Sequence, residues 1–192
     1  MKKVLLSLGL LMSVATAASA QEIRFGVKAG ANYSSITANN TDGVESKIGL
    51  HAGALANFAL SDLISIQPEV LYSQKGYQSE EYNDIKYKIN YIDVPLLVKV
   101  NAGGLFFEGG PQVGFLAGAK VTNGDADTDI KGRYDRVDFG YVAGLGYQAT
   151  SGPMIGLRYN GGISTISKGD INPNKIRNSV FQLYVGYVFG GK

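Results

Sequence analysis

The chain has 192 residues, no cysteine, and 18 Lys and Arg against 16 Asp and Glu. Its length suits a single domain, and the absence of cysteine excludes disulfides and cysteine-ligated metal sites. The near-balance of charge excludes the strongly basic surface on which nucleic-acid binding depends, so no nucleic-acid partner is expected.

The first twenty residues differ in character from the rest. Lys2 and Lys3 precede an apolar run over 4–14, and small residues follow as far as Ala20. This is the pattern of a secretory signal peptide, which is removed from the mature protein. We therefore predict a cleaved signal peptide over 1–20 and one domain over 21–192. Beyond residue 20, no apolar run is long enough for a membrane-spanning helix.

From Phe25 to Phe189, apolar residues alternate with polar residues or glycine. Only a strand presents one face at every second residue. The alternation predicts eight strands, over 23–35, 47–58, 63–75, 87–100, 105–121, 137–149, 154–164 and 178–189. Short connections at 59–62, 101–104 and 150–153 contain the residues typical of tight turns. The other connections, at 36–46, 76–86, 122–136 and 165–177, are longer.

Short turns at one end of an even number of strands and long loops at the other are typical of outer-membrane barrels. The predicted fold is all-β, an eight-stranded antiparallel up-and-down transmembrane β-barrel with short periplasmic turns and four longer extracellular loops. A secreted lipocalin-like barrel would show the same alternation with its apolar face turned inward. The many glycines on the polar face favour the first fold, because a crowded interior needs positions without side chains.

Charged residues share the glycine-rich face. We interpret four carboxylates and four bases there as an ion-pair network inside the barrel, because each charge would be costly to bury without a partner. They are Lys28, Glu69, Asp93, Lys99, Glu108, Lys120, Asp138 and Arg158. Asn32 and His51 also lie on the glycine-rich face of their strands, and we expect them close together in the interior.

Aromatic residues on the apolar face gather toward the two strand ends, as expected of girdles at two membrane interfaces. The girdle next to the short turns comprises Phe25, Phe58, Phe107, Tyr147 and Phe189. The girdle nearer the long loops comprises Tyr33, Tyr72, Tyr141, Tyr159 and Phe181.

Pro68, Pro95 and Pro111 fall inside predicted strands, where each removes a hydrogen-bond donor that a closed sheet needs. We expect β-bulges at these positions, with the register shifted by one residue beyond them.

Several short stretches, in their order and spacing, resemble a known family. They are Gln67-Pro68-Glu69-Val70-Leu71-Tyr72-Ser73, Tyr91-Ile92-Asp93-Val94-Pro95-Leu96-Leu97, Gly109-Gly110-Pro111-Gln112-Val113-Gly114, Asp138-Phe139-Gly140 and Leu157-Arg158-Tyr159-Asn160. Together they resemble the outer-membrane β-barrel domain family of Bacteroidetes-type bacteria, often labelled porin-family or PorT-like, with an OmpX-like architecture. The resemblance implies a barrel in the outer membrane of a Gram-negative cell and implies little about activity.

His51 is the only histidine, so a catalytic triad or a histidine-bearing metal site would have to include it. We favour an interior histidine held by hydrogen bonds over a general base that acts on outer-leaflet lipid.

Asp125, Asp127 and Asp129 alternate like the start of a calcium loop. Ile130 and Arg136 stand where an EF-hand needs glycine and glutamate, so a solvated charged loop is the preferred interpretation. We expect no catalytic residue, no cofactor and no metal site.

The predicted function is that of a non-enzymatic outer-membrane protein with an envelope-structural, adhesion or interaction role carried by its loops. The alternatives are a narrow channel for small solutes or ions and a lipid-modifying enzyme that uses His51. The expected partners are outer-membrane lipid and lipopolysaccharide, the barrel-assembly machinery during insertion, and an extracellular or envelope protein bound by the loops.

Overall fold

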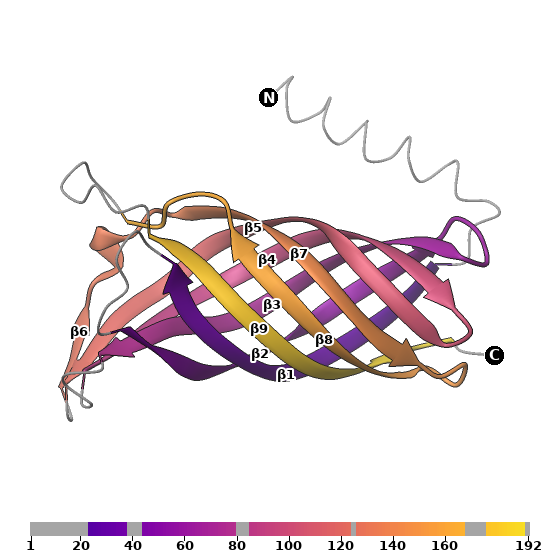
Figure 1. The fold of residues 1–192 in the computed structure, drawn as a ribbon, viewed down its shortest axis with the longest axis horizontal. Coiled ribbons are helices and arrows are strands. Elements are labelled where there is room, and N and C mark those ends of the chain that lie inside the picture. Colours follow the sequence, from indigo (N-terminus) through magenta and orange to yellow (C-terminus); the bar gives the residue numbers. More distant parts are fainter. Residues whose placement is uncertain (1–22, 38–43, 80–84, 124–125, 168–175, 191–192) are drawn as a thin grey trace, which may run out of the picture.

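The computed structural model describes residues 23–37, 44–79, 85–123, 126–167 and 176–190 (Figure 1). The predicted signal peptide over 1–20 and the predicted role of Asp125 therefore lie outside the described residues. Within them, no helix is long and apolar enough to cross a membrane.

Strands make up nearly all of the described chain, as the alternation predicts. They are β1 Ile23–Thr37, β2 Val44–Ala59, β3 Ile64–Ser79, β4 Ile85–Ala102, β5 Leu105–Asn123, β6 Ala126–Asp129, β7 Val137–Gln148, β8 Pro153–Gly162 and β9 Arg177–Val188, with a 3₁₀ turn η1 at Lys131–Arg133. The short strand β6 was not predicted, and it continues the sheet as a hairpin on β5.

Eight antiparallel strands of the described chain close into a barrel (Figure 1). The order around it is β4-β3-β2-β1-β9-β8-β7-β5, and pairing of β4 with β5 completes the ring. Pairing of β1 with β9 joins the two ends of the strand sequence. The predicted eight-stranded antiparallel barrel is therefore confirmed.

The barrel has its apolar face outside and its polar face inside. Large apolar side chains such as Leu50, Leu96 and Leu183 are more than half exposed on the outer surface. Polar side chains such as Gln67, Ser73 and Gln182 are almost completely buried. This is the reverse of a water-soluble barrel and suits a surround of lipid.

The connections differ between the two ends (Figure 1). β4 and β5 are joined by a two-residue hairpin turn in which Gly103 and Gly104 have φ of 61° and 94°, a conformation that favours glycine. The strands extend further toward the long-loop end than predicted, so the connections at 38–43 and 80–84 are shorter than expected. The connections at 124–136 and 163–176 are the long ones.

The expectation of bulges at the three prolines is wrong. The pairings of β3 with β4, and of β5 with β7, keep one register on both sides of Pro68 and Pro111. Pro95 pairs opposite Gln112, and the β4–β5 register is the same before and after a short unpaired stretch. Short unpaired stretches between neighbouring strands accommodate the missing N–H donors of the prolines. These stretches leave the alternation of inward and outward side chains unchanged.

The register shifts elsewhere. Asn90 lies opposite Gly118 and Tyr91 lies opposite Leu116, so Ala117 is an extra residue on β5. A second irregularity lies between Ser46 and His51 on β2. An extra residue reverses the in-and-out alternation beyond it, because the side-chain period of a strand is two.

Candidate functional site

A network of ion pairs occupies the centre of the barrel lumen. Arg158 on β8 donates from Nη1 to Glu69 Oε2 at 2.9 Å and from Nη2 to Glu69 Oε1 at 3.1 Å. Its Nε donates to Glu108 Oε1 at 2.8 Å. Lys28 Nζ donates to Glu69 Oε2 at 3.0 Å. These four side chains have no exposed surface, so the cost of burying each charge is offset by its partners.

Tyr184 on β9 packs directly against this network. Its hydroxyl donates to Glu108 Oε1 at 2.9 Å, and Lys28 Nζ lies 4.0 Å from the centre of its ring. The ring needs the space left by Gly156, where a Cβ atom would lie 2.5 Å from Tyr184 Cζ. Tyr184 is not among the predicted interior residues, although its parity along the strand matches that of buried Gln182.

A hydrogen-bonded layer of neutral side chains lies next to the network, toward the long loops. His51 Nδ1 is 2.7 Å from Asn32 Oδ1, and Gln182 Nε2 donates to the same oxygen at 2.8 Å. Asn32 Nδ2 donates to the carbonyl oxygen of Gln74 at 2.8 Å. Because Asn32 Oδ1 can only accept, the proton of the imidazole lies on Nδ1. His51 is 2% exposed, so it is enclosed by the lumen rather than presented to the outer leaflet.

A second charged layer lies nearer the long loops. Lys75 Nζ on β3 is 2.9 Å from Asp93 Oδ1 on β4, and each side chain is 1% exposed. Asp138 accepts hydrogen bonds from Asn178 Nδ2 at 2.8 Å and Ser164 Oγ at 3.0 Å. The void beside Lys75, Asp138 and Asn178 measures about 10 Å³, which is room for about one water molecule.

Seven of the eight charged residues predicted for the interior are buried there: Lys28, Glu69, Asp93, Lys99, Glu108, Asp138 and Arg158. The prediction for Lys120 is wrong, because its side chain is 58% exposed. The extra residue Ala117 reverses the alternation along β5: Leu116 before it is buried, and beyond it Ala119 is buried while Lys120 is not.

Lys75 takes the place that Lys120 was expected to fill. With it, the buried charges of the described residues comprise four acids and four bases. The signal was present in the sequence, because Lys75 shares its parity with Glu69 on the same strand. Lys75 stands at the last position of the predicted strand 63–75 and is not among the predicted interior charges.

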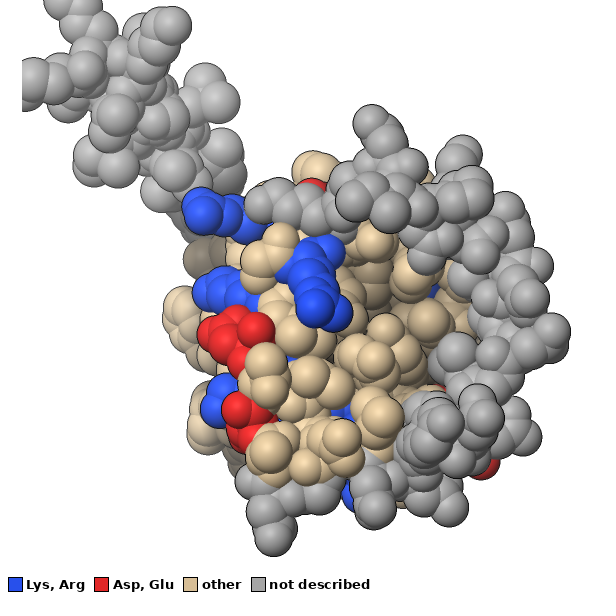
Figure 2. All heavy atoms as spheres, turned by 90° about the vertical axis from the view of Figure 1, so that its left-hand side faces the viewer, with Lys and Arg blue, Asp and Glu red and all other residues tan. Residues whose placement is uncertain are grey.

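The long-loop end of the lumen is closed by an apolar cap. The strands contribute Ile36, Ile89, Tyr91, Leu116 and Ala119, and the β5–β7 and β8–β9 connections contribute Ile130, Tyr134 and Ile166. The backbone of Asp135 donates to the carbonyl oxygen of Ile166 at 2.9 Å, which ties the two connections together. Figure 2 looks onto this end and shows uncharged side chains across its middle.

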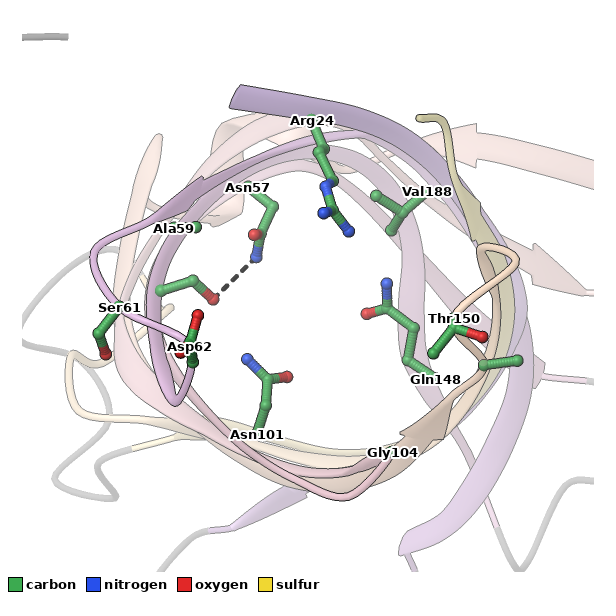
Figure 3. Close-up of a pocket in the computed structure, with 12 residues that line it drawn as sticks. Arg24, Asn57, Ala59, Ser61, Asp62, Asn101, Gly104, Gln148, Thr150 and Val188 are labelled. Carbon is green, nitrogen blue, oxygen red and sulfur yellow. Dashed lines mark hydrogen bonds between the residues drawn. The ribbon is translucent and has the colours of Figure 1, made fainter. Parts of the chain in front are cut away.

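At the other end the lumen opens as a polar vestibule of about 350 Å³ (Figure 3). Arg24, Asn57, Asn101 and Gln148 surround it and point inward. The buried Lys99 contacts one of these residues: its Nζ donates to Gln148 Oε1 at 2.6 Å and lies 3.9 Å from the centre of the Phe106 ring. Phe106 belongs to an apolar cluster with Leu55, Met154, Tyr184 and Val188. The vestibule is thus separated from the cap by the packed layers described above.

The predicted girdle residues lie on the outer surface. Those more than 40% exposed are Phe25, Tyr33, Tyr72, Phe107, Tyr141, Tyr147, Phe181 and Phe189. Phe58 and Tyr159 are partly buried. The ring of Tyr159 packs between its neighbours, with centres 6.1 Å from Tyr141 and 5.0 Å from Phe181.

Asp127 lies on β6, beyond the barrel wall. Thr122 Oγ1 donates to its carboxylate at 2.7 Å, and Lys120 Nζ and Lys88 Nζ are 3.5 Å and 4.0 Å away. The hydrogen bond from Thr122 and the two lysines lower the pKa of Asp127 below its usual range. Within the described residues, no group of three or more His, Cys, Asp or Glu side chains is arranged to hold a metal ion.

Comparison with known proteins agrees with the barrel geometry. The family described as "Outer membrane protein beta-barrel domain" matches residues 19–168. Among curated proteins, none matches the sequence.

Three solved structures illustrate the likeness of fold. Neisserial surface protein A is 18% identical with a TM-score of 0.57, over 85% of this chain and 96% of that chain. Ail, the attachment invasion locus protein of Yersinia pestis, is 15% identical with a TM-score of 0.52, over 88% and 99%. Ail in complex with the heparin analogue sucrose octasulfate is 16% identical with a TM-score of 0.51, over 88% and 99%.

Proposed function

The chain belongs to the outer membrane protein beta-barrel domain family, and from this premise we propose that it is a closed, non-conducting barrel that acts through its long loops. Arg158 carries the proposal. Its guanidinium binds both Glu69 and Glu108 in the middle of the lumen with no exposed surface. A solute moving along the barrel axis would have to break these buried ion pairs, which is costly.

The proposed role is adhesion to, or interaction with, an extracellular or envelope partner. Loops on a rigid scaffold commonly carry function, and in this barrel the connections at 124–136 and 163–176 are the longest. The attachment invasion locus protein of Yersinia pestis has a similar fold, which supports adhesion as one form of this role.

The proposal includes a cellular location and an orientation in the membrane. The sequence over 1–20 acts as a cleaved signal peptide, and the barrel-assembly machinery inserts the remaining domain. The short turns face the periplasm and the long loops face the cell exterior. The narrower kinship with Bacteroidetes-type, PorT-like barrels of OmpX-like architecture rests on the sequence stretches quoted above.

The proposal assigns no catalytic activity. A lipid-modifying enzyme would need its general base within reach of a lipid ester. The imidazole of His51 instead lies among Asn32, Gln182 and Tyr184 inside the lumen.

A narrow channel is the second candidate, and the vestibule of about 350 Å³ is the observation that favours it. Planar-bilayer recordings on the purified, refolded protein distinguish the two functions. The closed barrel gives no reproducible conductance steps, with insertion verified by heat-dependent gel mobility and a porin as positive control. Reproducible steps that disappear when the protein is heat-denatured would establish the channel instead.

Labelling of single cysteines tests the orientation, because the natural chain contains no cysteine. In intact cells, a bulky impermeant maleimide should label Arg133→Cys on η1 and leave Gln148→Cys in the vestibule unlabelled. Permeabilising the outer membrane should expose Gln148→Cys. The reverse pattern would show that the long loops face the periplasm.

Crosslinking from the same loop position then tests for a partner. A photocrosslinker at Arg133 should capture a defined protein or glycan on intact cells. The matched control is a crosslinker at exposed Leu183 on the outer wall, which should capture lipid only.

A further inference from the structure

The barrel wall is interrupted between β5 and β7, near their long-loop ends. Pairing of the two strands stops at Phe115 and Val137, and β5 meets β6 only from Lys120 onward. Backbone hydrogen bonds continue one residue further on each side, from Leu116 N to the carbonyl oxygen of Arg136 and from Ile130 N to the carbonyl oxygen of Ala119. Between these bonds the chain leaves the sheet, and Ile130 and Tyr134 turn into the cap. A groove of about 730 Å³ results, lined by Phe115, Leu116, Lys131, Gly132, Arg136 and Val137.

Two cationic side chains line this groove. Lys131 and Arg136 are exposed, and neither forms an ion pair with a carboxylate of the described residues. Lys131 Nζ donates to the carbonyl oxygen of Ala117 at 2.8 Å. The extra residue on β5 therefore holds the ammonium group against the groove, and two of its three protons remain for another acceptor.

The other wall of the groove is apolar and belongs to the outer surface. Phe115 and Val137 line it, and Phe115 is 48% exposed. Outside the groove, Phe139 follows Val137 on the same face of β7 and is 54% exposed. Tyr141, of the predicted girdle nearer the long loops, follows on the same strand face. The groove thus lies where the apolar outer band meets the charged loops.

We propose that this groove binds the phosphate of an anionic glycolipid of the outer leaflet, with an acyl chain lying against Phe115 and Val137. An ammonium and a guanidinium group that line one groove match a phosphate group in charge and in hydrogen-bond donors. A lipid supplies both the phosphate and the apolar chain that the two walls need, whereas free phosphate uses only one wall. The proposal rests on the orientation proposed above and is independent of conductance and of any loop partner.

Native mass spectrometry of the full mature chain, released from detergent with added diphosphorylated lipid A, tests the proposal. The double variant Lys131→Gln, Arg136→Gln should weaken lipid binding about 10- to 30-fold, because each cation near a lipid surface contributes roughly a fivefold effect. The matched control Lys47→Gln, Lys86→Gln loses the same charge at the same end of the barrel and should bind like the wild type. Heat-dependent gel mobility establishes that each variant is folded.

Two further binding measurements identify which part of the lipid the groove recognises. Dephosphorylated lipid A should bind the wild type as weakly as the phosphorylated lipid binds the double variant, and inorganic phosphate at equal concentration should not displace the lipid. Equal loss in the control pair, or equal binding of both lipids, would overturn the site. Displacement by inorganic phosphate would show an anion site rather than a lipid site. Cysteine labelling reports a wrong orientation separately, so the two failures are distinguishable.

Discussion

Arg158 and Glu69, 89 positions apart in the sequence, form a two-point ion pair across the barrel lumen, with N–O distances of 2.9 Å and 3.1 Å. The planar guanidinium faces both carboxylate oxygens while its Nε also reaches Glu108. One side chain on β8 thereby links the wall formed by β3 with the wall formed by β5.

Replacing Arg158 with methionine should strongly destabilise the barrel. The change leaves Glu69 and Glu108 buried with too few partners, which costs about 3–5 kcal/mol. Urea unfolding in micelles, followed by heat-dependent gel mobility, measures the loss. Arg133→Met, at an exposed position on η1, serves as the control and should change stability by no more than about 0.5 kcal/mol. Similar losses in the two variants would contradict a central role for Arg158.

Lys75→Met and Lys120→Met test which lysine belongs to the lumen. Lys75→Met leaves the buried carboxylate of Asp93 without its ion-pair partner and should lower the unfolding free energy by about 3–5 kcal/mol. Lys120→Met removes an exposed charge and should cost no more than about 0.5 kcal/mol. If the costs were reversed, the shift in strand register at Ala117 would be contradicted.

Gly156→Ala should destabilise the barrel through Tyr184. The new methyl group would lie 2.5 Å from both Cζ and the hydroxyl oxygen of Tyr184, so the ring must move away from Glu108. Overpacking of this kind costs about 1–3 kcal/mol. At Gly118 a Cβ meets nothing within 4 Å, and Gly118→Ala should be neutral or stabilise by up to about 1 kcal/mol. Equal effects at the two glycines would show that the interior is loosely packed.

His51→Ala should leave the lipid A profile of the native strain unchanged, as determined by mass spectrometry of extracted lipid. The same change should lower stability by about 1–3 kcal/mol, because it removes the hydrogen bond to Asn32 and leaves a cavity. An altered acyl or headgroup pattern in the variant strain would revive the catalytic alternative.

The β5–β6 hairpin should loosen in acid. Since the pKa of Asp127 is lowered in the folded chain, its contribution is present above the ordinary value of 3.8 and is lost as the pH falls through the lowered value. Amide hydrogen exchange across Ala126–Asp129 measures the loosening. Asp127→Asn should remove this pH step, and a step that persists in the variant would assign it to another group.

Alternation along the chain predicted all eight barrel strands and the inward position of seven charged residues. It succeeded because the direction of a strand side chain depends only on its parity. The same dependence explains the failure at Lys120, since one extra residue reverses every position beyond it. The prediction of bulges at the prolines failed for a related reason. The sequence shows that an N–H donor is missing, but it does not show the short unpaired stretch of sheet that accommodates the loss.

Local sequence therefore established the strands, the balance of buried charge and the apolar outer surface, all of which follow from residue type and period two. The pairing, closure and packing of the strands decided the rest. Only the ring of eight strands brings Arg158 to both Glu69 and Glu108. Pairing of the neighbouring strands β3 and β4 gives Asp93 its partner Lys75. Tertiary packing also brings Ile130, Tyr134 and Ile166 together with Ile36 and Ile89 in one cap, and these contacts join residues that are remote along the chain. The interruption between β5 and β7 leaves the groove at Lys131 and Arg136.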